Sequence, residues 1–78
     1  MTSIHRAVLD AIPISSIITD GLVSRALGDV GATVASASPE HYESALPRIR
    51  RRLAVYFTDE DLSRVMIRIS SALDRRRE

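Results

Sequence analysis

Two histidines near carboxylates are the residues in this chain whose types could support catalysis or bind a metal ion. His5 precedes Asp10, and His41 lies between Glu40 and Glu43. Neither grouping has the His-x-x-x-His or Glu-x-x-His spacing that places two ligands on one face of a helix. A catalytic site also needs a nucleophile, a base and a group that orients the base, and the sequence offers no such set. We therefore predict surface histidines, no catalytic residues, no metal, no cofactor and no enzymatic activity.

A run of three acids, Asp59-Glu60-Asp61, could coordinate calcium, but it lacks the alternating ligands and the central glycine of an EF-hand loop. Helix capping accounts for the run better. The hydroxyl of Thr58 can accept a hydrogen bond from a free amide of the first helical turn, and carboxylates are favoured at the positive end of the helix dipole. The run therefore predicts a structural corner at which a helix begins.

Arginines between residues 48 and 52 are the strongest indication of a binding function. On a helix, Arg48, Arg51 and Arg52 project from one outward face, and Arg50 lies at its border. Such a face could contact nucleic-acid phosphates, or it could bind protein, because arginine is enriched at protein interfaces. The net charge is only +1 and no aromatic residues alternate with the arginines. We favour a protein partner and keep a small DNA-binding transcriptional regulator as the alternative.

The positions of apolar residues after Thr58 predict the best-defined helix of the chain, beginning at about residue 59. The residues recur at intervals of three and four, which places them on one face. They are Leu62, Val65, Met66, Ile69, Ala72 and Leu73. Three arginines, Arg75, Arg76 and Arg77, suit the negative end of the helix dipole.

Two helices are predicted in the first half of the chain. Ser3 can cap a short helix over residues 4–12, and Pro13 ends it because proline disfavours helical geometry in the preceding residue. A second helix is predicted from about residue 16 to residue 30. The small residues at 31–38 predict a loop or a frayed helix end.

Pro47 determines how the third helix is predicted. An unbroken helix over residues 39–57 would lose one amide donor and place the proline ring against a carbonyl, at a cost of about 3 kcal/mol. We therefore predict a short turn at 39–43 and a separate helix at 45–57 that is capped by Ser44. Its inward residues are expected to be Leu46, Ile49, Leu53, Tyr56 and Phe57. The last helix begins almost immediately afterwards, which favours an antiparallel or strongly bent helix pair.

Several apolar residues lie off the predicted inward faces and indicate a contact surface. Ile67 projects opposite the apolar stripe of its helix, Val55 points away from the inward residues, and Ile17 lies beside the main face of the second helix. Single exposed apolar residues are common on soluble proteins. In a chain of this size, three of them make a homodimer or a partner-binding surface a reasonable expectation.

The composition indicates one folded domain covering residues 1–78. Hydrophobic residues make up 45% of the chain and charged residues 27%, which excludes a disordered protein. A chain of 78 residues buries only about 60% of its unfolded surface, so self-association would help to stabilise it. The absence of cysteine fits a reducing compartment, and no segment resembles an export signal or a membrane span. We expect a cytoplasmic protein with no membrane association.

Residues 45–73, with the segments Leu53-Ala54-Val55 and Thr58-Asp59-Glu60-Asp61-Leu62, resemble small orphan helical proteins of actinobacterial phages, particularly mycobacteriophages. Residues 18–27 resemble the first half of such proteins. All eleven basic residues are arginine, which agrees with a GC-rich coding sequence. The resemblance implies a non-structural phage protein that acts in the cytoplasm of the host bacterium. It implies no catalytic or binding residues, because none are assigned in that family.

The predicted fold is therefore all-α, a compact bundle of three main amphipathic helices plus a short N-terminal helix. The predicted function is that of a small non-enzymatic protein-interaction module, which binds or modulates a host protein or binds a second copy of itself as a homo-oligomer. The predicted partner-binding residues are Arg48, Arg51, Arg52 and Ile67.

Overall fold

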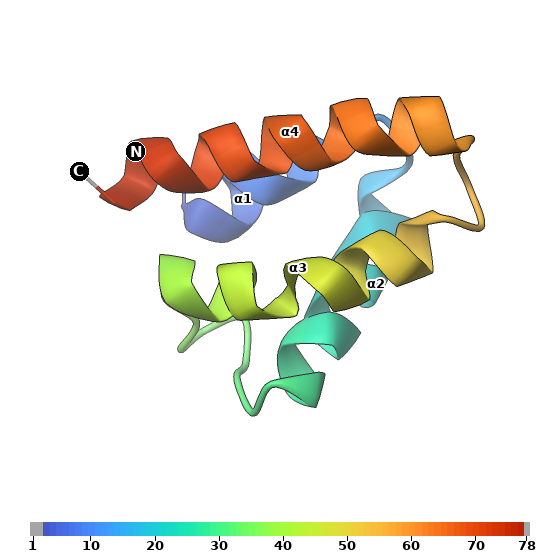
Figure 1. The fold of residues 1–78 in the computed structure, drawn as a ribbon. Coiled ribbons are helices and arrows are strands. Elements are labelled where there is room, and N and C mark those ends of the chain that lie inside the picture. Colours follow the sequence, from blue (N-terminus) through green and yellow to red (C-terminus); the bar gives the residue numbers. More distant parts are fainter. Residues whose placement is uncertain (1–2, 78) are drawn as a thin grey trace.

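Four helices form the framework of the molecule (Figure 1). The computed structural model describes the backbone of residues 3–77 and the side chains of residues 3–75. Helix α1 spans Ile4–Asp10, α2 spans Ser16–Asp29, α3 spans Pro39–Leu53 and α4 spans Asp59–Arg77. Residues 3–77 contain no strand. The predicted all-α bundle of three main helices and a short N-terminal helix is confirmed.

Helix α4 begins and packs as its sequence predicts. The Thr58 hydroxyl accepts a hydrogen bond from the amide of Asp61, with 3.3 Å between the two atoms. Glu60 and Asp61 then bind Arg64 at 2.8 and 3.5 Å. Five of the six predicted inward residues are buried, and Met66 is half-buried. The side chains of Arg76 and Arg77, which are predicted to stabilise the helix end, lie outside the described residues.

The first two helices also have the predicted termini, with small differences in length. The Ser3 hydroxyl accepts from the Arg6 amide at 3.1 Å and caps α1. This helix ends at Asp10, two residues before the predicted end. The buried side chain of Ile12 lies beyond the helix and still belongs to the core.

Gly31 ends helix α2 because it adopts a left-handed conformation, with φ of +78°. The Gly31 amide donates to the Gly28 carbonyl at 3.1 Å, and the Ala32 amide donates to the Leu27 carbonyl at 2.9 Å. These two bonds form a Schellman motif, which satisfies carbonyls at the helix end that would otherwise have no donor. Turns without regular structure then lead through residues 30–38 to α3.

Helix α3 is continuous through Pro47, and the predicted break at residues 39–44 is wrong. Ser44 lies inside the helix and caps nothing. The continuous helix buries Tyr42 and Ala45 before the proline and Ile49 and Leu53 after it, in one core. Burial of each large apolar side chain contributes about 1.5–3 kcal/mol, so the two halves together offset the cost of roughly 3 kcal/mol for an internal proline.

The end of α3 also differs from the prediction. The helix ends at Leu53, four residues early. Tyr56, predicted to face inward, is half-exposed in the turn that follows, and Phe57 is half-buried against the core. After this turn α4 runs back antiparallel to α3, which is one of the two predicted arrangements (Figure 1).

A single core lies where the four helices meet. Helix α3 packs against α2 on one side and α4 on the other, while α1 packs against α4 and α2. None of the helices among the described residues combines the length and apolar character required to cross a membrane.

Candidate interaction surfaces

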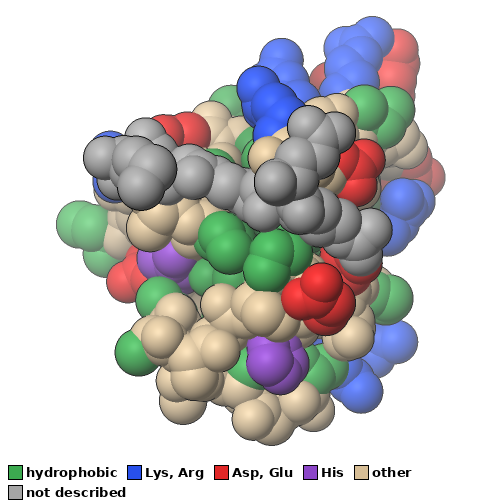
Figure 2. Space-filling view, turned by 90° about the vertical axis from the view of Figure 1, so that its left-hand side faces the viewer, with side chains coloured by type: hydrophobic (Ala, Val, Ile, Leu, Met, Phe, Trp, Pro, Cys, Tyr) green, Lys and Arg blue, Asp and Glu red, His purple; other side chains and the backbone are tan. Residues whose placement is uncertain are grey.

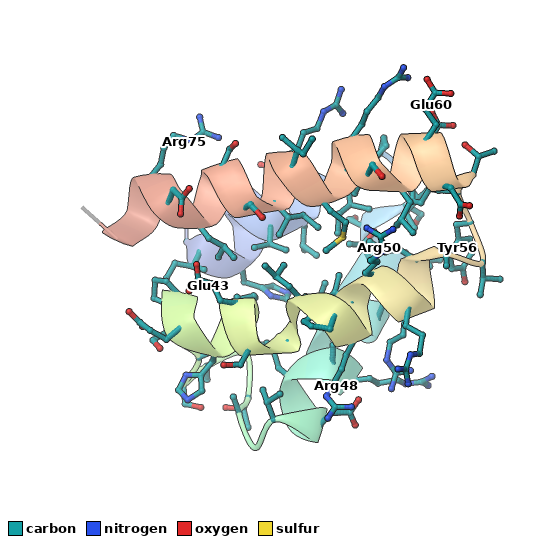
Figure 3. The ribbon with its side chains drawn as sticks, in the orientation of Figure 1. Glu43, Arg48, Arg50, Tyr56, Glu60 and Arg75 are labelled. Atoms are coloured by element: carbon teal, nitrogen blue, oxygen red, sulfur yellow. The ribbon has the colours of Figure 1, made fainter. Side chains whose placement is uncertain are left out.

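Arg48 and Arg51 lie on the solvent-exposed side of α3, as predicted. Both side chains are exposed, and neither forms an ion pair with a residue that the structure describes. Figure 3 shows Arg48 directed away from α4. Ala54 keeps a helical conformation after the last residue of α3, so Val55 continues the same face one turn beyond Arg51. Val55 is 84% exposed. We call Arg48, Arg51 and Val55 the arginine face of α3.

Arg52 has a structural contact that the sequence pattern did not reveal. Its side chain is only 33% exposed, and its guanidinium donates to the Asp29 carboxylate at 3.2 Å. Asp29 is the last residue of α2. Arg52, which we expected to project outward, therefore joins the end of α3 to the end of α2 and is less available to a partner than Arg48 or Arg51.

Ile67 lies on a separate surface, at the outside of α4. It is 66% exposed and lines two grooves. The α1–α4 groove, of about 630 Å³, has a floor of small residues that includes Ala7, Ala11 and Ala72. The α3–α4 groove, of about 380 Å³, contains Arg50, whose side chain is directed toward α4 (Figure 3). The predicted partner-binding residues thus belong to two surfaces.

Charged side chains are unevenly distributed over the end of the molecule shown in Figure 2. Arginines gather at the top of this view, over α4, and at its right-hand edge. The lower part consists largely of backbone and small polar side chains. This part corresponds to the connection between α2 and α3, whose residues from Gly31 to Ser38 are all small.

His5 forms a hydrogen-bonded chain that the sequence did not predict. Its Nε2 atom lies 2.6 Å from Asp20 Oδ1, and its Nδ1 atom lies 3.0 Å from Tyr42 Oη. His5 lies in α1, Asp20 in α2 and Tyr42 in α3. The imidazole is 15% exposed, so the prediction of a surface histidine is wrong at this position. The local sequence around His5 could not indicate these contacts, because the two partners are 15 and 37 residues away along the chain.

The proton positions in the hydrogen bonds of His5 follow from Asp20, which is the acceptor at one end. An ionised Asp20 can only accept, so Nε2 of His5 must carry a proton, and in neutral histidine Nδ1 is then the acceptor for the Tyr42 hydroxyl. Tyr42 is 1% exposed. Burial, and secondarily the negative charge of Asp20, raise the pKa of the Tyr42 phenol above its ordinary value and keep the donor protonated.

This arrangement links helices and leaves neither nitrogen of His5 free to act as a base. Ser3 and Ser16 line a shallow hollow beside His5 and Asp20. Both imidazole nitrogens are already occupied, however, and the Tyr42 hydroxyl is enclosed in the core. A hydroxyl nucleophile needs an adjacent base whose nitrogen points toward it. The chain Asp20–His5–Tyr42 therefore serves to hold α1, α2 and α3 together.

The second histidine has a local role at the start of α3. The Ser38 amide donates to His41 Nδ1 at 3.0 Å, within the first turn that Ser38 and Pro39 begin. The His41 side chain is therefore used for helix capping, and it is exposed as predicted. Among the residues the structure describes, no three His, Cys, Asp or Glu side chains come close enough together to hold a metal ion.

Comparison with protein-family models, with curated proteins and with solved structures finds no match to this chain.

Proposed function

We propose that this protein is a small non-enzymatic interaction module that binds an acidic surface of another protein through the arginine face of α3. The observation that supports this best is that Arg48 and Arg51 are exposed and form no ion pair with any described residue. Next to them are the exposed side chains of Val55 and Tyr56. Arginine and tyrosine are both enriched at the energetically important centres of protein interfaces.

A protein partner fits this surface better than DNA does. A helix-turn-helix joins its two helices by three or four residues, whereas nine residues, 30–38, connect α2 to α3. A recognition helix also presents its N-terminal residues to the bases, and the first turn of α3 carries the acid Glu40. The arginines lie in the second half of the helix. The resemblance to phage proteins makes a protein of the host bacterium the partner that we propose.

Affinity capture from bacterial lysate tests this proposal. The bait is the whole chain, compared with the double variant Arg48→Ala/Arg51→Ala. The matched control is Arg6→Ala/Arg25→Ala, which removes two exposed arginines from α1 and α2 and lowers the net charge equally. We expect one protein to be retained by the wild type and the control and lost from the arginine-face variant.

Two outcomes would contradict the proposal. If the retained proteins are the same for all three baits, the arginine face is only a solvated surface. If the chain instead shifts random duplex DNA at low salt, and the Arg48→Ala/Arg51→Ala variant does not, the alternative of a small DNA-binding regulator is correct.

A further inference from the structure

The outer side of α4 carries four residues whose spacing is the same in both directions along the helix. Arg64, Ile67, Ser71 and Asp74 follow at intervals of three, four and three residues. These intervals place all four on one face of a helix, and all four side chains are exposed. We call these four residues the crest of α4. The crest lies opposite the buried stripe that includes Leu62, Ile69 and Leu73, and Figure 3 shows the neighbouring Glu60 and Arg75 pointing away from the rest of the molecule.

Because the spacing is symmetric and the two ends carry opposite charges, the crest is complementary to a second copy of itself in an antiparallel orientation. In an antiparallel helix pair related by a two-fold axis, each residue of the crest faces the residue at the mirrored position of the other helix. Ile67 then faces the partner's Ser71, and Arg64 faces the partner's Asp74. The symmetry produces each contact twice, so the interface contains two contacts between Ile67 and Ser71 and two ion pairs.

The size of the residues on the crest also suits close contact between helices. Helices pack with their axes about 8–10 Å apart when the side chains between them are small enough. Ser70 and Ser71 are small, and Ile67 is the one large apolar residue on this side of α4. The α1–α4 groove lies directly beside Ser71, and its floor of alanines can receive part of the partner's Ile67.

The charges on the crest favour an antiparallel pair of copies over a parallel pair. A parallel pair would place Arg64 against Arg64 and Asp74 against Asp74, which is repulsive. Within one copy, Asp74 forms no ion pair with a described residue. Arg64 binds Glu60 and Asp61, but all three side chains are more than half exposed, so these pairs stabilise the monomer little. The guanidinium has further donors for another carboxylate.

The surface area that a stable dimer must bury is compatible with the size of the crest and the grooves beside it. A stable interface of standard size takes about 800 Å² from each partner. The described surface of one copy is 4840 Å², so the interface requires roughly one sixth of it. A helix of 19 residues with the rims of the grooves on both sides is long enough to provide that share.

From the spacing, the exposed Ile67 and the complementary charges, we propose that the chain forms an antiparallel homodimer through the crest of α4. This surface is separate from the arginine face of α3, so the dimer does not depend on the proposed function. Each copy would still expose Arg48 and Arg51 to a partner.

Sedimentation equilibrium of the whole chain over a wide concentration range tests the dimer, with two single charge reversals. Arg64→Asp gives a crest with two acids, and Asp74→Arg gives a crest with two arginines. Each variant on its own would place like charges together at both ends of the interface. We expect self-association of each to be at least about tenfold weaker than that of the wild type. An equimolar mixture of the two should form a heterodimer, because each end then pairs an acid with an arginine.

Two further variants complete the test. Ile67→Glu removes the apolar contact and should give a monomer, whereas Arg25→Asp makes the same charge change as Arg64→Asp on α2 and should dimerise like the wild type. Far-UV circular dichroism checks that every variant remains helical. The proposal is overturned if the wild type stays monomeric at the highest concentration, or if both reversed variants self-associate as strongly as the wild type. Neither result would affect capture of a partner by the arginine face.

Discussion

Removal of the Tyr42 hydroxyl tests whether the chain Asp20–His5–Tyr42 holds the helices together. We predict that Tyr42→Phe lowers the free energy of unfolding by about 1–2 kcal/mol. The substitution keeps the buried ring and its packing, so it changes only the hydrogen bond to His5 Nδ1 at 3.0 Å. Any loss of stability can therefore be assigned to that bond.

The expected magnitude follows from two effects. A hydrogen bond between neutral groups contributes about 0.5–1.5 kcal/mol to stability, and a partner left unsatisfied in a buried place costs about 1–3 kcal/mol. His5 is 15% exposed, so water can partly satisfy Nδ1 and the lower part of the second range applies. A domain of 78 residues has a total stability of about 4–12 kcal/mol. The predicted change would be a clear fraction of it.

Urea unfolding followed by far-UV circular dichroism measures the effect. Tyr56→Phe is the matched control, because Tyr56 is half-exposed and its hydroxyl makes no hydrogen bond to a described residue. We expect the control to change stability by less than about 0.5 kcal/mol. A double-mutant cycle with His5→Ala then isolates the pair, and Tyr42→Phe should cost almost nothing in the His5→Ala background.

The reasoning would be refuted by either of two results. Equal small effects for Tyr42→Phe and Tyr56→Phe would mean that the buried hydroxyl does not stabilise the fold. A full effect of Tyr42→Phe in the His5→Ala background would mean that the hydroxyl acts through something other than His5.

Two further predictions concern alkaline pH and the internal proline. Because the pKa of Tyr42 is raised in the folded state, the unfolded chain loses its phenolic proton first, and stability should fall as pH rises above about 10 and through the folded pKa. The chain has no lysine or cysteine, so a pH titration of the unfolding midpoint that falls less steeply for Tyr42→Phe would assign the effect to this residue. For Pro47→Ala, we expect a gain of roughly 2 kcal/mol in urea unfolding, because alanine restores a helical amide and removes a ring clash, less the entropy that proline takes from the unfolded chain. An unchanged or lower midpoint would contradict this reasoning.

Local sequence signals predicted where α1 and α4 begin. Ser3 and Thr58 cap the helices that follow them, and both caps make the expected hydrogen bond to an amide three residues later. The buried face of α4 also follows from the spacing of its apolar residues. These features depend on interactions within one or two helical turns, which the order of residues fixes directly.

Pro47 shows where a local rule was overridden. The cost of an internal proline is local, but the gain from a continuous α3 comes from its packing against two other helices, α2 and α4. In the continuous helix, Tyr42 before the proline and Leu53 after it both lie in the core. The packing energy that makes α3 continuous could therefore not be predicted from the sequence of residues 39–57 alone.

The candidate surfaces divide in the same way. The sequence by itself determined that Arg48, Arg51 and Ile67 are exposed, because exposure follows from helical periodicity. Only the tertiary structure decided that Arg52 binds Asp29, that His5 joins Asp20 and Tyr42, and that Ile67 lies between two grooves on a separate side. Periodicity gives the direction of a side chain relative to its own helix. What that side chain meets depends on how the helices are packed, which is set by the burial of the whole core.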